Sequence, residues 1–400
     1  MARRRSSRAR RCPLCGLPMR RNGYTKAGRQ RWRCDACSAS GVAARPDATR
    51  LAEFRAWLPW VLGRTDVLQA ARAIGVTSRQ GFAKRTAWCW SVRPRLPKPA
   101  RAHCVEVDGT YLNGWCLLVA VDAGDGRPLA FQWCDTEKKA AWLALFRRIP
   151  RPDVIVCDGG RGCLAAIGAR WPGMRVQRCL VHVLRNTRTD LTSRPRTEPG
   201  RALYRLAKRL VDTERCGTPE QARQWLADLN EWYRENRDWL GERTVARDPD
   251  TGFHRTWYTH QRARDAYHRL ARLNAAGMLF TWLDPALNAG GPVAWNTNML
   301  EGGTNKPIKD AMRRHNGLSP EHARRVCEWI LYMRTRDPEP ERLAKNALRR
   351  GEPEPRKAGD AIALPGLDRR SVQQPAPDDP GVDPYESGFG IRKGWAGQST

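Results

Sequence analysis

The chain has 400 residues, 41% of them hydrophobic, which is enough for two or three domains and at least one large core. Its formal net charge of +30 indicates an acidic partner, and nucleic acid is the usual partner of so basic a protein. We expect neither a membrane span nor a signal peptide, because the sequence has no apolar run of about 18 residues and no apolar segment after its basic start. We therefore expect a cytoplasmic, nucleoid-associated protein.

Residues 1–45 are expected to form a basic arm and a zinc ribbon. Cys12 and Cys15 are followed by a second pair, Cys34 and Cys37, beyond an arginine-rich hairpin. Two close cysteines supply two thiolates, and two such pairs complete a tetrahedral site for one structural Zn²⁺. The alternative is four unrelated buried cysteines. The remaining nine of the thirteen cysteines are expected to be small core residues, because disulfides are rare in the cytoplasm.

Residues 46–92 are expected to form a helix-turn-helix. Apolar residues recur at helical spacing, a helix is predicted over 66–74, and Gly75 lies in the turn that follows. Ser78 can cap a second, basic helix, which is the usual position of a recognition helix. The alternative is a plain helical hairpin. The residues expected to contact DNA are Arg79, Lys84 and Arg85.

A proline-rich linker over 93–101 precedes an α/β catalytic core over 102–340. Alternating apolar runs predict five strands, the first ending at Asp108 and the fourth at Asp158. Helices over 138–148 and 164–171 give the order β-β-β-α-β-α-β, which is that of the ribonuclease-H-like fold. The predicted strands are 103–108, 115–122, 129–134, 154–158 and 174–179.

A large all-α insertion is expected at about 190–295, and residues 341–400 are expected to be a disordered tail. The insertion carries many tryptophans, most of them expected in its core, although one is a candidate to stack on an unpaired base. Thr218 begins a capping-box pattern with proline at the first turn. Two further helices are predicted over 298–313 and 319–336.

The acids at the strand ends suggest a site for two divalent metal ions. Two ions can activate the attacking oxygen and stabilise the leaving oxygen of a phosphodiester, and Mg²⁺ prefers carboxylate ligands. Asp108 and Asp158 would lie on neighbouring strands of a ribonuclease-H-like sheet, and Glu301 can supply a third carboxylate from a helix. Acids that merely terminate strands are the alternative, with Glu106 the main rival to Asp108. The other competing acids are Asp122 and Asp135.

Two motifs carry a family resemblance. Cys179 and His182, separated by two residues after the fifth strand, resemble the Cys-x-x-His signature of the Mutator-type transposases and their bacterial insertion-sequence relatives. The asparagine-rich run over 298–309 is similar to the segment that holds the catalytic glutamate in that family. The resemblance covers residues 100–335 and implies a DDE-type triad of Asp108, Asp158 and Glu301 that binds two Mg²⁺ or Mn²⁺ ions. The supporting residues it suggests are Cys179, His182, Arg185, Asn298, Lys306 and Lys309.

Cys179 and His182 have two open interpretations. No matching pair of ligands stands out nearby in the sequence, so we do not expect a zinc site there. His182 could contact a phosphate near Asp158, or the two residues could be a buried cysteine and a hydrogen-bonded core histidine.

The resemblance implies a transposase that binds terminal inverted repeats, cleaves one strand and joins the new 3′-OH to target DNA. Its partner is double-stranded DNA, and a homodimer or larger assembly is expected, because two ends must be held together. One alternative is a nuclease of the same fold that joins nothing. Another is a zinc-ribbon regulator that binds DNA without cutting it.

Overall fold

The computed structural model describes residues 10–349, apart from 13–14, 27, 29, 43–45, 113, 248–251 and 253. Most of the expected basic arm and the expected tail from residue 350 lie outside the described residues. The chain forms two compact units, and each is described by itself. The first contains residues up to Pro94 together with a segment from Glu339, and the second extends from Arg95 to Pro338.

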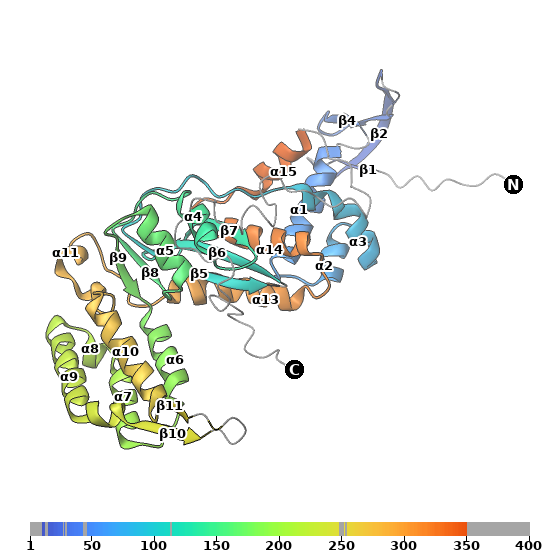
Figure 1. The fold of residues 1–400 in the computed structure, drawn as a ribbon. Coiled ribbons are helices and arrows are strands. Elements are labelled where there is room, and N and C mark those ends of the chain that lie inside the picture. Colours follow the sequence, from blue (N-terminus) through green and yellow to red (C-terminus); the bar gives the residue numbers. More distant parts are fainter. Residues whose placement is uncertain are drawn as a thin grey trace. The chain divides into compact units, whose positions relative to one another are not determined.

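The first unit begins with a four-stranded antiparallel sheet in the order β1-β2-β3-β4 (Figure 1). Strands β2 and β3 form the expected arginine-rich hairpin, which brings Met19 opposite Cys34. Only a few residues, among them Met19, are buried with the cysteines, so the sheet has very little apolar core. The strands are β1 (Arg10–Arg11), β2 (Pro18–Tyr24), β3 (Gln30–Cys34) and β4 (Ser40–Val42).

The helices of the first unit follow the sequence prediction closely. Asp66 accepts hydrogen bonds from two backbone N–H groups at the start of α2, and Ser78 accepts one from Gly81 at 3.1 Å at the start of α3. Gly75 has a φ of 72°, which a glycine adopts without strain, and this allows the tight turn between the two helices. The elements are α1 (Pro46–Val61), α2 (Val67–Ala73), α3 (Arg79–Thr86) and η1 (Ala87–Ser91).

A helix occupies the first part of the segment expected to be a disordered tail. Helix α15 (Pro340–Arg349) packs on α1, and Glu341 accepts hydrogen bonds from the Arg55 guanidinium at 2.7 and 2.8 Å. The charged and proline-rich composition hid this helix, because its apolar positions are few and its partner lies far away in the sequence.

The second unit is built on a five-stranded sheet in the order β7-β6-β5-β8-β9 (Figure 1). Strands β5, β6 and β7 are antiparallel, whereas β8 and β9 run parallel to β5. The predicted order β-β-β-α-β-α-β is confirmed. The strands are β5 (Cys104–Leu112), β6 (Trp115–Asp122), β7 (Pro128–Cys134), β8 (Val154–Cys157) and β9 (Arg175–Arg178).

Both faces of this sheet are covered. Helices α4 (Lys139–Phe146) and α5 (Arg161–Arg170) bury large apolar side chains such as Trp142 on one face. On the other face, β5 and β8 pack against Val293 and the segment around η2 (Thr281–Leu283) and α11 (Pro285–Asn288). A sheet covered on both sides explains why its strands are almost uninterrupted apolar runs.

A helical block with its own core follows β9. Trp225 and Leu270 are among its fully buried residues, and Thr218 forms the predicted capping box. Most of its tryptophans are buried or half-buried, as expected. The helices are α6 (Leu180–Leu191), α7 (Glu198–Arg209), α8 (Thr213–Cys216), α9 (Pro219–Gly241) and α10 (Gln261–Ala275).

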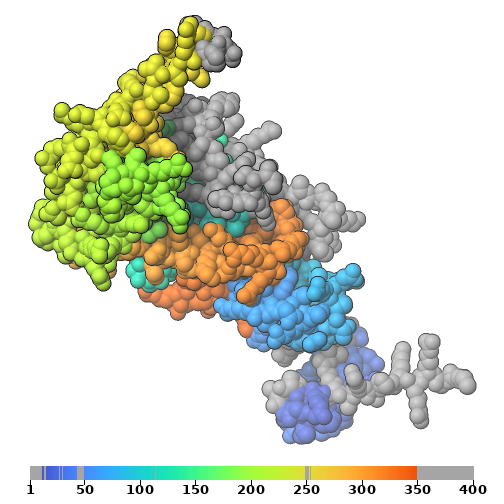
Figure 2. Space-filling model, turned by 90° about the horizontal axis from the view of Figure 1, so that it is seen from below, coloured from blue at the N-terminus to red at the C-terminus, as the bar shows by residue number. Residues whose placement is uncertain are grey.

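The expectation of an all-α insertion is wrong in one place. Strands β10 (Arg243–Arg247) and β11 (His254–Tyr258) form an antiparallel hairpin between α9 and α10. Figure 2 shows it as a yellow arm that projects beyond the helices. Its arginines and threonines give no clear apolar alternation, because both faces are largely exposed, and so the pattern did not predict strands.

The helix predicted over 298–313 is interrupted. Helix α12 (Asn298–Leu300) passes into a π-helical turn, η3 (Glu301–Asn305), and then into α13 (Lys306–Arg314). Gly302 and Gly303 lie in the π turn, where glycine weakens the ordinary helical preference. Helix α14 (Pro320–Tyr332) follows, and within the described part of the chain no helix is long and apolar enough to cross a membrane.

Candidate functional site

Asp108 and Asp158 lie at the end of the pairing between two neighbouring strands. The last registered pair of the parallel strands β5 and β8 is Val107 with Cys157, so both aspartates come next along their strands. They are 8% and 7% exposed. Asp158 follows β8 directly, as predicted. Asp108, however, lies within β5, which continues to Leu112 because β6 remains paired with it.

The glycine after each acid has a distinct structural reason. Gly109 is buried within β5, where a Cβ atom would lie 2.6 Å from the carboxyl carbon of Glu137. Gly159 has a φ of 78°, and a Cβ atom there would lie 1.9 Å from the guanidinium carbon of Arg178. Arg178 in turn donates to the backbone oxygen of Asp158. Both glycines therefore leave room for a neighbouring side chain, and Arg178 fixes the loop that carries Asp158.

Glu301 reaches this region from the π turn η3. Its Oε1 accepts a hydrogen bond from the buried hydroxyl of Thr297 at 2.9 Å. Four residues further on, the Asn305 amide donates to Asp108 Oδ2 at 3.2 Å, which joins the π turn to β5. The side chain of Glu301 remains one-third exposed, so it can reach a ligand from the solvent side.

Cys179 and His182 lie next to Glu301. The ligand atoms of these three side chains are within 4.8 Å of one another, and His182 Nδ1 is 3.6 Å from Glu301 Oε1. Thr297 also donates to Cys179 Sγ at 3.3 Å. The sequence offered no further ligand for this pair, but the fold brings Glu301 next to it from 122 residues beyond Cys179.

The charges in this cluster favour a thiolate and an imidazolium. Burial lowers the pKa of His182, but the Cys179 thiolate and the carboxylates of Asp108 and Glu301 outweigh it and raise that pKa overall. Burial also opposes ionisation of Cys179, but hydrogen bonds from His182 and Thr297 lower its pKa. The negative charges of both Asp108 and Glu301 therefore act on His182, and Glu301 is the one at a contact distance of 3.6 Å.

The rival acids of the sequence have other partners. Glu106 is fully buried on β5, and its Oε2 accepts a hydrogen bond from the backbone N–H of Leu300 at 2.9 Å. Burial raises the pKa of Glu106 to about 7, against the opposing effect of backbone N–H groups. Asp122 accepts from Arg127 at 2.9 Å and from Gly124 at 3.0 Å, so it stabilises the β6–β7 turn.

The supporting residues suggested by the resemblance lie mainly on the surface. Arg185 on α6, Lys306 and Lys309 on α13, and Asn298 on α12 are all exposed. Lys306 forms an ion pair with Asp310 at 2.8 Å on the same helix, which contributes little in water. These side chains are accessible to a phosphate backbone, and they take no part in the hydrogen bonds that hold the acids.

The sequence alone did not point to Thr297, Asn305 or Arg178. Thr297 and Asn305 lie in or beside the asparagine-rich run, and each is four residues from Glu301. On a helix this spacing puts a side chain near Glu301, which is the signal that could have drawn attention to them. Arg178 carries no such signal, because its partner is a backbone oxygen in the loop that follows β8.

Four cysteines form the second candidate site. Cys12, Cys15, Cys34 and Cys37 have their sulfur atoms within 4.8 Å of one another, with separations of 3.4 to 3.6 Å for three of the pairs. Tetrahedral zinc with Zn–S bonds of about 2.3 Å would keep sulfur ligands about 3.8 Å apart. The cluster thus fits a structural zinc ion, as predicted.

The three residues of α3 that were expected to contact DNA differ in their exposure to solvent. Arg79 and Lys84 are exposed. Arg85 is half-buried and donates to Glu53 at 2.8 Å and to the backbone oxygen of Ile74 at 2.9 Å. Glu53 is 3% exposed and also accepts from Trp88 at 3.1 Å. Arg85 therefore stabilises the helical core of the first unit, which leaves Arg79 and Lys84 available to a ligand.

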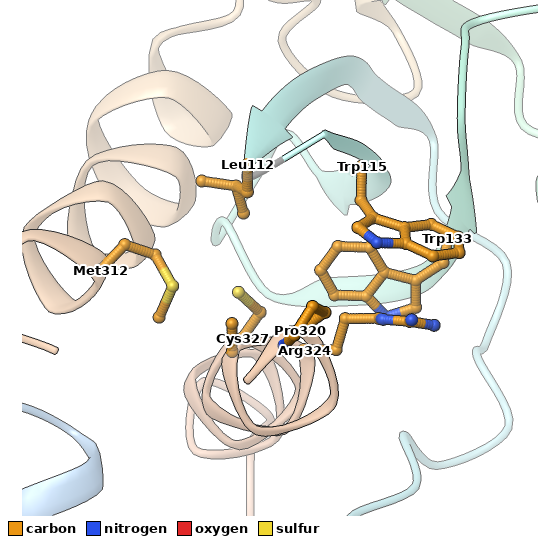
Figure 3. Close-up of a pocket in the computed structure, with 8 residues that line it drawn as sticks. Leu112, Trp115, Trp133, Met312, Pro320, Arg324 and Cys327 are labelled. Carbon is orange, nitrogen blue, oxygen red and sulfur yellow. The ribbon is translucent and has the colours of Figure 1, made fainter. Parts of the chain in front are cut away.

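A small pocket lies between the end of the β5–β6 hairpin and helices α13 and α14 (Figure 3). The Arg324 guanidinium lies 3.8 Å from the centre of the Trp115 ring, a cation–π contact. The pocket contains none of the acids described above, and its lining is mainly apolar, so we assign it to packing. It is lined by Leu112, Trp115, Trp133, Met312, Pro320, Ala323, Arg324 and Cys327.

Comparison with known proteins identifies one family that part of the chain resembles. Residues 108–238 match the family described as "Transposase, Mutator family". The match begins at Asp108 and includes Asp158, Cys179 and His182, but it ends before Glu301. No curated protein matches the chain. This match confirms the resemblance inferred from the sequence: residues 108–238 are similar to transposases of the Mutator family.

Proposed function

We propose that the chain is a DDE-type transposase whose catalytic domain, residues 102–340, is ribonuclease-H-like. The sheet order and the two aspartates beside the β5–β8 pairing support this fold. The observation that carries the proposal is that the π turn η3 holds Glu301 and bonds to Asp108 through Asn305, while Asp158 follows the neighbouring strand β8. Such a set of carboxylates suits two Mg²⁺ or Mn²⁺ ions.

Asp108, Asp158 and Glu301 would hold the ions. Bound metal ions would activate the attacking oxygen and stabilise the leaving oxygen of the phosphodiester. Asn305 orients Asp108, Thr297 orients Glu301, and Arg178 fixes the Asp158 loop through hydrogen bonds. The raised pKa of His182 favours its positively charged form beside Glu301, and this form would also attract the phosphate of DNA.

The proposed reaction has two displacements at phosphorus. In the first, water breaks one phosphodiester bond at the element's end and leaves a free 3′-OH. In the second, this hydroxyl attacks a phosphodiester of the target, forms a new bond to its phosphorus and displaces the target strand's own 3′ oxygen. The same carboxylates serve both steps, and no covalent bond between protein and DNA is needed.

The first unit would recognise the ends. Its four-cysteine cluster and the exposed Arg79 and Lys84 of α3 support a zinc ribbon followed by a helix-turn-helix on the terminal inverted repeats. Because both ends must be cut together, we propose a homodimer or larger complex on DNA.

The test is cleavage of labelled DNA from the flanks of the coding sequence, with Mg²⁺ or Mn²⁺. We expect wild type to cut, and Asp108→Asn, Asp158→Asn and Glu301→Gln to bind the DNA without cutting it. Normal cleavage by the Glu301 variant would remove this residue from the site and return Glu106 or Asp122 to consideration.

A further inference from the structure

Glu106 connects the two elements that carry Asp108 and Glu301. It lies two residues before Asp108 in β5, so by strand alternation both side chains point to the same face of the sheet. Its Oε2 accepts a hydrogen bond at 2.9 Å from the backbone N–H of Leu300, the residue directly before Glu301. One carboxylate therefore spans from the strand of one acid to the backbone of the other.

This link is enclosed and local. Glu106 and Leu300 are both 0% exposed, so water cannot replace the hydrogen bond between them. Leu300 is also the last residue before the π turn, where the helix loses its regular hydrogen bonding. Because the backbone of Leu300 is held directly before this irregular turn, the hydrogen bond helps to determine the direction of the first side chain of the turn, which is Glu301.

A second contact makes the arrangement rigid. Asn305, the last residue of η3, donates to Asp108 Oδ2 at 3.2 Å. The π turn is thus attached to β5 at both ends, by Glu106 before Glu301 and by Asn305 after it. The distance between the carboxylates of Asp108 and Glu301 therefore depends on the attachment of the π turn to β5 as well as on the helix.

From this geometry we propose that Glu106 is a positioning residue for Glu301, which it holds in register with Asp108 through the Leu300 amide. The proposal depends on the proposed role of Asp108 and Glu301 in catalysis. It contrasts with the alternative that Glu106 is itself a metal ligand. One observation favours that alternative: Glu106 Oε1 is buried and makes no hydrogen bond with any residue that the structure describes.

Two substitutions separate these roles. Glu106→Gln keeps an acceptor oxygen for Leu300 but removes the negative charge, whereas Glu106→Leu keeps the bulk and removes the acceptor. We expect the full-length Gln variant to cleave end DNA within about fivefold of wild type. We expect the Leu variant to lose about 100-fold, because a shift of about 1 Å in a reacting group has an effect of this size. DNA affinity should be unchanged in both.

Hydrogen exchange gives a readout independent of metal and activity. In the full chain, the Leu300 amide should exchange slowly in wild type and Glu106→Gln and fast in Glu106→Leu. Val105→Ala is the matched control, because Val105 is a buried neighbour on the opposite face of β5. This variant should lower the unfolding temperature and leave both Leu300 exchange and cleavage at low temperature close to wild type.

Each outcome has one meaning. Loss of cleavage in Glu106→Gln as severe as in Asp108→Asn, with slow Leu300 exchange retained, would overturn the proposal and make Glu106 a metal ligand. Full activity of a folded Glu106→Leu would overturn it as well. Full activity of Asp108→Asn and Glu301→Gln would overturn the proposed function itself. These two control variants therefore distinguish a failure of the proposed function from a failure of the proposed role of Glu106.

Discussion

Gly159 illustrates how single residues shape the site. Its positive φ and the Arg178 guanidinium beside it both exclude a side chain. We expect Gly159→Ala to destabilise the fold by about 1–3 kcal/mol, because it adds backbone strain and displaces Arg178 from the Asp158 loop. Gly168→Ala is the control, since Gly168 lies in α5 with open space around it and should be neutral or slightly stabilising. Thermal unfolding of both variants measures the difference, and equal unfolding temperatures would contradict this account.

Thr297 holds Glu301, the proposed catalytic carboxylate, through a single hydroxyl group. It is buried and donates to Glu301 at 2.9 Å and to Cys179 at 3.3 Å. Thr297→Val keeps the shape without the donor, so we expect cleavage to fall about 10- to 100-fold with DNA affinity unchanged. Thr297→Ser restores the hydroxyl and should recover most of the activity. If Val and Ser variants were equally active, the hydroxyl would have no positioning role.

At the scale of elements, the strands and the acids beside them could be predicted because their signals are local. Alternating or continuous apolar runs end at or near Asp158 and Asp122, and the Ser78 and Thr218 caps stand immediately before their helices. The π turn and the partners of Arg85 could not be predicted. They depend on contacts between residues far apart in the chain, such as Glu106 with Leu300 and Arg85 with Glu53.

The four-cysteine sheet should depend on zinc for its fold. Apart from its cysteines it buries little apolar surface, so the metal has to supply most of the stability. We expect about one zinc ion per chain and expect Cys34→Ser to lose it. Loss of the zinc ion, or removal of residues 1–45, should weaken the binding of end DNA while the second unit stays folded. Cys216→Ser, which changes a buried cysteine outside the cluster, should keep the metal. Unchanged end binding without zinc would make this sheet a structural or oligomerisation module.

We expect the hairpin β10–β11 of the insertion to contact DNA. Trp257 is 47% exposed there, and Arg247 and Arg255 are exposed on the same hairpin. Base–aromatic stacking is worth about 1–3 kcal/mol, so Trp257→Ala should weaken binding of ends with unpaired bases by about 5- to 100-fold.

Trp257→Phe keeps an aromatic ring and serves as the control for this prediction. It should bind such ends close to wild type. Equal affinity of the Ala variant and wild type would exclude the hairpin from the interface.

The net charge of +30 is a property of the whole molecule that affects its affinity for DNA. Bound lysine and arginine side chains release counterions from the phosphates, so affinity for any DNA should fall steeply with salt. Charge alone therefore provides binding without selectivity. In the proposed mechanism, selectivity for the reacting bond would come instead from a few buried contacts, such as those of Glu106 with Leu300 and of Asn305 with Asp108, which attach η3 to β5.

The most direct test of the central claim is a strand-transfer assay. Purified wild type and Asp108→Asn would be compared on labelled end DNA with a target plasmid and Mg²⁺ or Mn²⁺. We predict joined products from wild type only, which would establish transposition chemistry and the metal site together. Cleavage without joining would contradict the transposase account in favour of a nuclease, and binding with neither reaction would favour a regulator.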